Sequence, residues 1–210
     1  MTTIAPFSAA DVRGFLHRPA KANGAGLVIT HGAGADCQGP VLVEAARAFA
    51  DAGLVVLRCD LPFRQQRPSG PPPRGSGVAD RAGLRSAVAE MRRLVSGPVF
   101  LGGHSYGGRM SSMLAAEEPE IAKALLLLSY PLHPPKKPEQ LRTDHFRDLR
   151  TRAVFVHGTV DGFGTIAEMK AAIAAIPAAH TLIPVEGAGH DLRRGRIDFA
   201  APIAALLDGV

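Results

Sequence analysis

The chain of 210 residues has only two cysteines, Cys37 and Cys59, and no tryptophan. Two thiols are too few for the disulfide framework of a small secreted domain. No segment approaches the roughly 18 consecutive apolar residues that cross a bilayer. Residues 1–14 lack the basic start and the apolar run of a secretory signal. We therefore expect a cytoplasmic protein with no membrane partner.

Positive charge is in small excess: the chain has 24 lysines and arginines and 19 acidic residues, which gives a net charge of +5. Proteins that bind nucleic acid usually gather basic residues on one face and add aromatic side chains for stacking. Here aromatic residues make up 5% of the chain, and the basic residues are scattered. We expect solvated surface charges and no nucleic-acid partner. The tightest basic groups are Arg64, Arg67 and Arg74, and Arg193, Arg194 and Arg196.

The remaining composition is that of an ordinary globular protein, with 46% hydrophobic and 20% charged residues. The length fits one domain spanning residues 1–210, and no internal repeat or long linker interrupts it. The sequence leaves open whether the chain is a monomer or a homodimer.

Short apolar runs recur along the chain and are continuous rather than alternating, as in strands covered on both faces. Helical patterns with one apolar face lie between them. Strands that alternate with helices predict an α/β fold with a mostly parallel central sheet flanked by helices. The expected strands are residues 27–29, 54–57, 99–101, 125–128, 154–156 and 181–183, and the expected helices include residues 42–49, 84–95, 166–176 and 203–207.

Two proline-rich stretches, residues 63–77 and 131–149, break this rhythm. Each follows the C-terminal end of a predicted strand, which is the edge where open α/β sheets bind ligands. We expect residues 63–77 to form a loop, and only the second half of 131–149 to have any helix. Loops of this length in a compact domain are more often functional than not.

Residues 103–107 read Gly-His-Ser-Tyr-Gly and stand between a predicted strand and a helix-compatible stretch, residues 109–117. In this context Gly-x-Ser-x-Gly describes a nucleophile elbow, in which the serine occupies a strained turn. Its glycines allow the close approach of strand and helix. The pattern predicts that Ser105 is a catalytic nucleophile.

A carboxylate and an imidazole follow in the order that this arrangement requires. Asp161 ends His-Gly-Thr-Val-Asp after one predicted strand, and His190 follows Gly-Ala-Gly after the next. A serine hydroxyl needs a base to take its proton, and the base needs an acid to orient it. We expect His190 to be the base and Asp161 the orienting acid.

Acyl transfer also needs hydrogen-bond donors for the developing oxyanion. Residues 30–34, Thr-His-Gly-Ala-Gly, follow the first predicted parallel strand. In this kind of fold that loop supplies one backbone N–H and the residue after the serine supplies another. We therefore expect the N–H groups of Ala33 and Tyr106 to form an oxyanion hole.

Two further residues are candidates for substrate binding. Arg64 lies after a strand and has the charge to pair with a substrate carboxylate, although a solvated loop arginine explains it equally well. His133 lies at the same edge of the predicted sheet.

Cys37 is more simply a small buried thiol than a second nucleophile. His133, Asp144 and His145 lack compact metal-ligand spacing, so we expect neither a metal nor another cofactor.

These motifs resemble α/β-hydrolases over residues 26–192, and most closely the small, lidless, dienelactone-hydrolase-like branch. That branch includes the testis-expressed and nonspecific-lethal-complex hydrolase-like proteins. The Ser-Tyr-Pro-Leu-His-Pro stretch at residues 129–134 and Asp-Leu-Pro-Phe-Arg at 60–64 point to it. The resemblance implies eight strands, a minimal or absent cap and an esterase-like activity.

Two functions of different classes follow. The first is a serine hydrolase that cleaves a small carboxylic ester, thioester or lactone through an acyl-enzyme. The second is a hydrolase-fold scaffold or binding protein with little turnover, as some relatives in this branch are. Within the enzymes, a peptidase or a perhydrolase also stays open, because water access and pocket shape are not readable from sequence.

Overall fold

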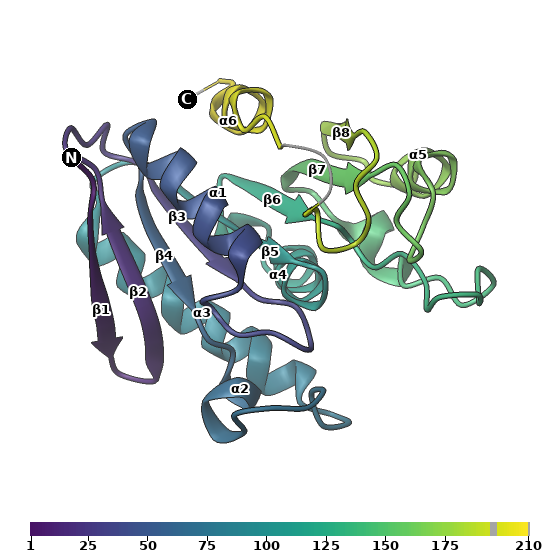
Figure 1. Ribbon diagram of the computed structural model, residues 1–210, viewed down its shortest axis with the longest axis horizontal. Helices are drawn as coiled ribbons and strands as arrows, with labels where there is room; N and C mark the ends of the chain where they lie inside the picture. The colour runs from purple at the N-terminus through teal and green to yellow at the C-terminus, as the bar shows by residue number, and fades with distance from the viewer. Residues whose placement is uncertain (194–196, 210) are drawn as a thin grey trace.

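The computed structural model describes residues 1–193 and 197–209 and shows a twisted sheet with helices on both faces (Figure 1). The strands are β1 (Thr3–Ala9), β2 (Val12–Arg18), β3 (Gly26–Thr30), β4 (Val55–Cys59), β5 (Val99–His104), β6 (Ala124–Leu128), β7 (Arg152–Gly158) and β8 (His180–Val185). The helices are α1 (Pro40–Asp51), α2 (Pro62–Gln66), α3 (Gly77–Leu94), α4 (Tyr106–Glu117), α5 (Ile166–Ile173) and α6 (Ala200–Leu207). Two short 3-10 helices are η1 (Pro119–Ile121) and η2 (Asp144–Asp148).

The eight strands form one sheet in the order β1-β2-β4-β3-β5-β6-β7-β8. β2 pairs antiparallel with β1 and β4, and every other neighbouring pair is parallel. The predicted mostly parallel α/β architecture is therefore confirmed. The eight strands implied by the family resemblance are also present.

The continuous apolar runs are explained by helices on both sides of the sheet. In β3, Val28 belongs to the core beneath α3, α4 and α5. Its neighbours Leu27 and Ile29 point to the opposite core, beneath α1 and α6. Because successive strand residues face opposite sides, a strand buried on both faces has no polar alternation.

Two local expectations differ from the structure. The strand pattern did not identify β1 and β2, because β1 is largely exposed and has no continuous apolar run. The predicted loop 63–77 contains most of α2 and ends at the first residue of α3. As expected, residues 131–149 have helix only in their second half, where η2 lies. Arg194 and Arg196, expected to be surface charges, lie outside the described residues.

The parallel strands end at one edge of the sheet, and the loops at this edge bring together the candidate residues. The loop after β3 lies beside the turn between β5 and α4, since β3 and β5 are paired neighbours. The loops after β7 and β8 approach from the other side. Among the described helices, none has both the length and the apolar character needed to span a membrane.

Candidate active site

Ser105 occupies a sharp turn between β5 and α4, where it is the N-cap of the helix with φ 51° and ψ −115°. A positive φ is uncommon for a residue with a Cβ, and the surroundings must hold it in place. The Ser105 N–H donates to the carbonyl oxygen of Leu128 in β6 at 2.8 Å. The turn thus presents the serine hydroxyl above the sheet edge.

The glycines beside the serine are required by close packing. A Cβ on Gly103 would lie 2.5 Å from the carbonyl oxygen of Thr30. One on Gly107 would lie 2.7 Å from both the His31 carbonyl oxygen and the Thr30 Cγ2 atom. The absence of side chains therefore allows α4 to start directly against β3.

Ser105, His190 and Asp161 form a continuous hydrogen-bonded line. The Ser105 hydroxyl lies 2.8 Å from Nε2 of His190. On the other side of the ring, Nδ1 lies 2.8 Å from Oδ2 and 3.0 Å from Oδ1 of Asp161. With the Nδ1–H donating to the carboxylate, Nε2 is free to accept the serine proton.

The Asp161 carboxylate is fully buried and fixed by its own turn. Its Oδ1 accepts the backbone N–H of Phe163 at 2.8 Å. Nε2 of His157 lies 3.7 Å from its Oδ2 and donates to the Gly164 carbonyl at 2.7 Å. Burial lowers the pKa of His157, so this ring is neutral and does not add a second cation beside the carboxylate.

The His190 ring contacts two other rings. Phe163 stacks on it with a centroid distance of 4.0 Å and an angle of 26°. The His104 ring lies 5.3 Å from it, and His104 Nε2 donates to the His190 carbonyl oxygen at 2.7 Å. Burial lowers the pKa of His104 to about 4, which keeps this ring neutral near pH 7. These contacts limit the orientations of the histidine.

Two backbone amides adjoin the serine. Tyr106 begins α4, so its N–H has no earlier carbonyl in the helix to bond. Ala33 lies on the loop after β3, and both residues line the same cavity as Ser105. Neither N–H donates a hydrogen bond within the described parts of the chain. The geometry leaves both amides available to an acceptor beside Ser105.

The loop that carries Ala33 is bound to the segment after β4. The buried His31 ring donates to the Gly32 carbonyl at 2.9 Å and accepts the Leu61 N–H at 3.1 Å. The Asp60 carboxylate accepts the Cys37 N–H at 2.7 Å. Burial lowers the pKa of His31, consistent with a neutral ring that both donates and accepts.

The structure corrects the expectation for Arg64, which does not line the cavity. Its guanidinium is buried and donates to four backbone carbonyls. The acceptors are Ala35 at 2.8 Å, Ala33 and Gly70 at 2.9 Å each, and Arg67 at 3.1 Å. Arg64 therefore joins the loop after β3 to the proline-rich loop, and these contacts use four of its five guanidinium N–H groups.

His133 is likewise buried and absent from the cavity wall. Its Nδ1 donates to the Pro134 carbonyl at 2.8 Å, and its Nε2 lies 3.7 Å from the Glu168 carboxylate.

Cys37 is a buried free thiol whose pKa is raised by burial, which makes it a poor nucleophile. Within residues 1–193 and 197–209, no three His, Cys, Asp or Glu side chains cluster as metal ligands would.

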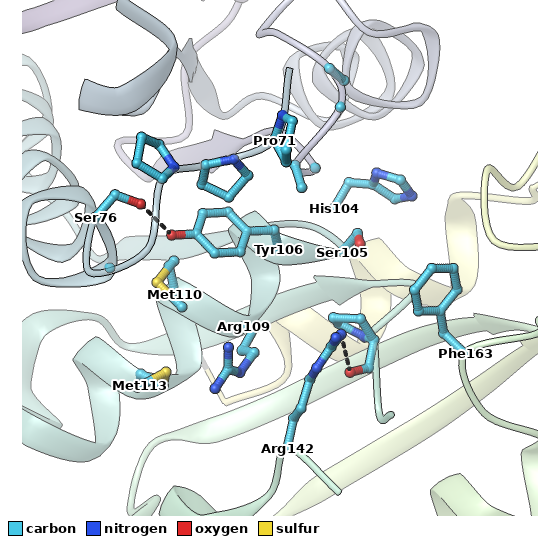
Figure 2. Close-up of a pocket in the computed structure, with 18 of the residues that line it drawn as sticks. Pro71, Ser76, His104, Ser105, Tyr106, Arg109, Met110, Met113, Arg142 and Phe163 are labelled. Carbon is cyan, nitrogen blue, oxygen red and sulfur yellow. Dashed lines mark hydrogen bonds between the residues drawn. The ribbon is translucent and has the colours of Figure 1, made fainter. Parts of the chain in front are cut away.

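A cavity of about 920 Å³ opens at Ser105 (Figure 2). In this view the proline-rich segment from Pro71 to Ser76 forms one side, and Arg109 and Arg142 lie on the other. The Tyr106 hydroxyl donates to the buried Asp80 carboxylate at 2.7 Å, which holds its ring in the wall. No separate cap domain covers the cavity in the described chain.

Sequence reasoning missed several cavity residues. Arg109 follows Ser105 by four positions, which places it one helical turn along the same face. This spacing could have identified Arg109 from the sequence as a residue near Ser105. Arg142 and Phe163 gave no such signal, because the loops after β6 and β7 decide where they lie.

The strand order, the serine turn after β5, and the Asp and His on later loops together define an α/β-hydrolase fold. The family described as alpha/beta hydrolase domain matches residues 23–200. The chain belongs to this family, and the predicted fold is confirmed.

Solved structures agree with this assignment. A dienelactone hydrolase from Anabaena variabilis is 20% identical, with a TM-score of 0.68, over 99% of this chain and 94% of its own. A lidless α/β serine hydrolase from Xanthomonas campestris is 16% identical, with a TM-score of 0.75, over 98% and 93%. Est1E from Butyrivibrio proteoclasticus, solved with ferulic acid, is 17% identical, with a TM-score of 0.74, over 96% of both chains. At these identities the likeness shows a shared fold.

Proposed function

We propose that this protein is a serine hydrolase of the carboxylesterase type, which cleaves a small ester, thioester or lactone through an acyl-enzyme. The observation that carries the proposal is the line from Ser105 through His190 to Asp161, with 2.8 Å at each of its two links. A strained serine beside an oriented imidazole is the arrangement that acyl transfer requires.

In the first half of the reaction, Ser105 Oγ bonds to the substrate carbonyl carbon and its proton passes to Nε2 of His190. Negative charge on the carbonyl oxygen is stabilised by the N–H groups of Ala33 and Tyr106. The bond from carbon to the leaving oxygen or sulfur then breaks, and His190 returns the proton to the leaving group.

In the second half, water attacks the acyl carbon and gives its proton to His190. The new acid forms as the bond to Ser105 Oγ breaks and the serine regains its proton. Asp161 stabilises the imidazolium that forms in each half. Phe163 and His104 limit rotation of the ring between the two transfers.

The alternative is a hydrolase-fold scaffold with little turnover. A scaffold has no physical need for a strained serine, a buried carboxylate and an oriented imidazole in one line, and this favours the enzyme. We also propose membership of the small, lidless, dienelactone-hydrolase-like branch, supported by residues 60–64 and 129–134. A peptidase or perhydrolase activity would use the same groups.

Labelling with a fluorophosphonate probe, read by mass spectrometry, tests the proposal. We expect the wild type to be labelled at Ser105 and the Ser105→Ala variant to be unlabelled. Ser76→Ala is the matched control, because Ser76 lines the same cavity without a histidine base, and labelling should persist. Folded wild type that remains unlabelled would contradict the proposal and favour the scaffold.

A further inference from the structure

The cavity around Ser105 is positively charged and has no acidic residue in its wall within the described chain. Four arginines line it, and they differ in how their charge is balanced. Arg81 pairs with Glu117, with 3.0 Å between Nε and Oε1. Arg74 is exposed to solvent on the proline-rich loop. Arg109 and Arg142 are both partly buried and make no ion pair within residues 1–193 and 197–209.

Arg109 is positioned by the first turn of α4. Its backbone N–H donates to the Ser105 carbonyl at 3.0 Å, so it lies four residues, or about 6 Å, along the helix axis from the serine. Its Nε atom is buried and has no hydrogen-bond partner in the described chain. A buried donor without an acceptor is costly, and an incoming acceptor would relieve that cost.

Arg142 comes from the loop after β6, and its backbone is firmly held. Its N–H donates to the Leu132 carbonyl at 2.8 Å, and its carbonyl accepts the Tyr130 hydroxyl at 2.6 Å. Among the described residues, its guanidinium makes only one hydrogen bond, a long one of 3.4 Å from Nη1 to the Pro131 carbonyl (Figure 2). Burial, and then the charge of Arg109, lower the pKa of Arg142.

From these contacts we infer that Arg109 and Arg142 bind the carboxylate of an anionic substrate, such as a half-ester of a short dicarboxylic acid. Two guanidinium groups in one partly buried pocket repel each other, and a carboxylate between them neutralises both. Guanidinium and carboxylate also match in geometry, with two parallel hydrogen bonds. The inference rests on the proposed function, because it assigns the substrate class of the same site.

The position of the arginines limits the substrate further. Arg109 starts one helical turn from Ser105, so the carboxylate and the scissile carbonyl belong to one short molecule. Met110 and Met113 line the cavity beside Arg109 and provide an apolar surface for the methylene groups between them. A long fatty acyl chain has no such charged end and would place methylenes against the arginines.

A pair of esters that differ only in charge tests the inference. The mono-p-nitrophenyl ester of glutaric acid is anionic, and methyl p-nitrophenyl glutarate is its neutral counterpart. We expect the wild type to have a kcat/KM at least about tenfold higher for the anionic ester, the usual effect of a charge-assisted hydrogen bond. In Arg109→Gln and Arg142→Gln this ratio should fall toward one.

Arg81→Gln is the matched control, because Arg81 lines the same cavity with its charge already paired, and the ratio should be unchanged. Arg109→Lys should keep part of the preference, since it keeps the charge but loses the planar fork. A wild-type ratio at or below one would overturn the inference. Arginine variants that lower the rates for both esters equally would also overturn it.

A binding measurement separates this inference from the proposed function. Calorimetric titration of Ser105→Ala compares monomethyl glutarate with dimethyl glutarate. Selective binding of the monoanion, lost in the additional Arg109→Gln change, supports the arginine site even without turnover. Hydrolysis of both esters without selective binding leaves the hydrolase intact and overturns the anionic substrate class.

Discussion

Arginine side chains near the active site differ in whether the protein itself supplies acceptors for their guanidinium N–H groups. Arg64 is surrounded by backbone carbonyls of two loops, and its donors are used internally. Arg109 has no such acceptor at its Nε atom among residues 1–193 and 197–209. The first arginine therefore stabilises the site, whereas the second is available to a ligand.

At the residue scale, we predict that Arg64→Gln lowers the free energy of unfolding by about 2 kcal/mol or more, because it leaves buried carbonyls without donors. Arg64→Lys should not restore this stability, since one ammonium cannot reach carbonyls in two loops. Urea denaturation measures both variants. A variant as stable as wild type, with only a raised KM for the anionic ester, would show that Arg64 binds substrate instead.

At the element scale, the active site depends on how closely α4 packs against β3. The serine turn, the first turn of α4 and the loop after β3 meet where glycine is the only residue that fits. This contact fixes the amide of Tyr106 relative to that of Ala33, and so sets the spacing of the proposed oxyanion donors.

Gly107→Ala tests this packing. Its Cβ would lie 2.7 Å from the His31 carbonyl oxygen, so we predict a loss of about 1–3 kcal/mol in the free energy of unfolding, together with a lower kcat. Gly162→Ala is the control, because a Cβ there would meet nothing within 4 Å. Equal stability of the two variants in urea denaturation would contradict the close-packing argument.

At the scale of the whole molecule, the chain holds several buried or partly buried histidines in neutral form. Burial is the largest cause of each lowered pKa, which reaches about 4 for three of these rings, from an ordinary value of 6.5. The rings at about 4 are His17, His104 and His145, and the pKa values of His31 and His157 are also lowered.

These histidines make stability depend on pH in a defined window. Between pH 6.5 and about 4 the unfolded chain binds more protons than the folded chain, so the free energy of unfolding falls as the pH falls. Each ring contributes at most about 1.4 kcal/mol per pH unit. Urea denaturation at pH 7, 6 and 5 measures the loss, which should be smaller in His145→Gln. A variant with the same pH dependence as wild type would contradict a neutral, partly buried His145.

Much of the fold was predictable because its signals are local. Continuous apolar runs mark strands covered on both faces, and the helical patterns between them predict parallel pairing. The outer hairpin β1–β2 was not identified individually, because a largely exposed edge strand has no continuous apolar run. Helix α2 was not predicted because it lies in a proline-rich stretch. Proline breaks a helix in its interior but is favoured at its first position, which is where α2 has one.

The sequence by itself determined the order of Ser105, Asp161 and His190 and the place of each after a parallel strand, because a parallel sheet brings such loop ends to one edge. Tertiary structure alone decided where the long polar side chains go. Arg64 and His133 turned inward to nearby carbonyls, whereas Arg109 and Arg142 line the cavity. A long flexible side chain goes to the acceptors that distant segments provide, and its own position in the chain does not encode them.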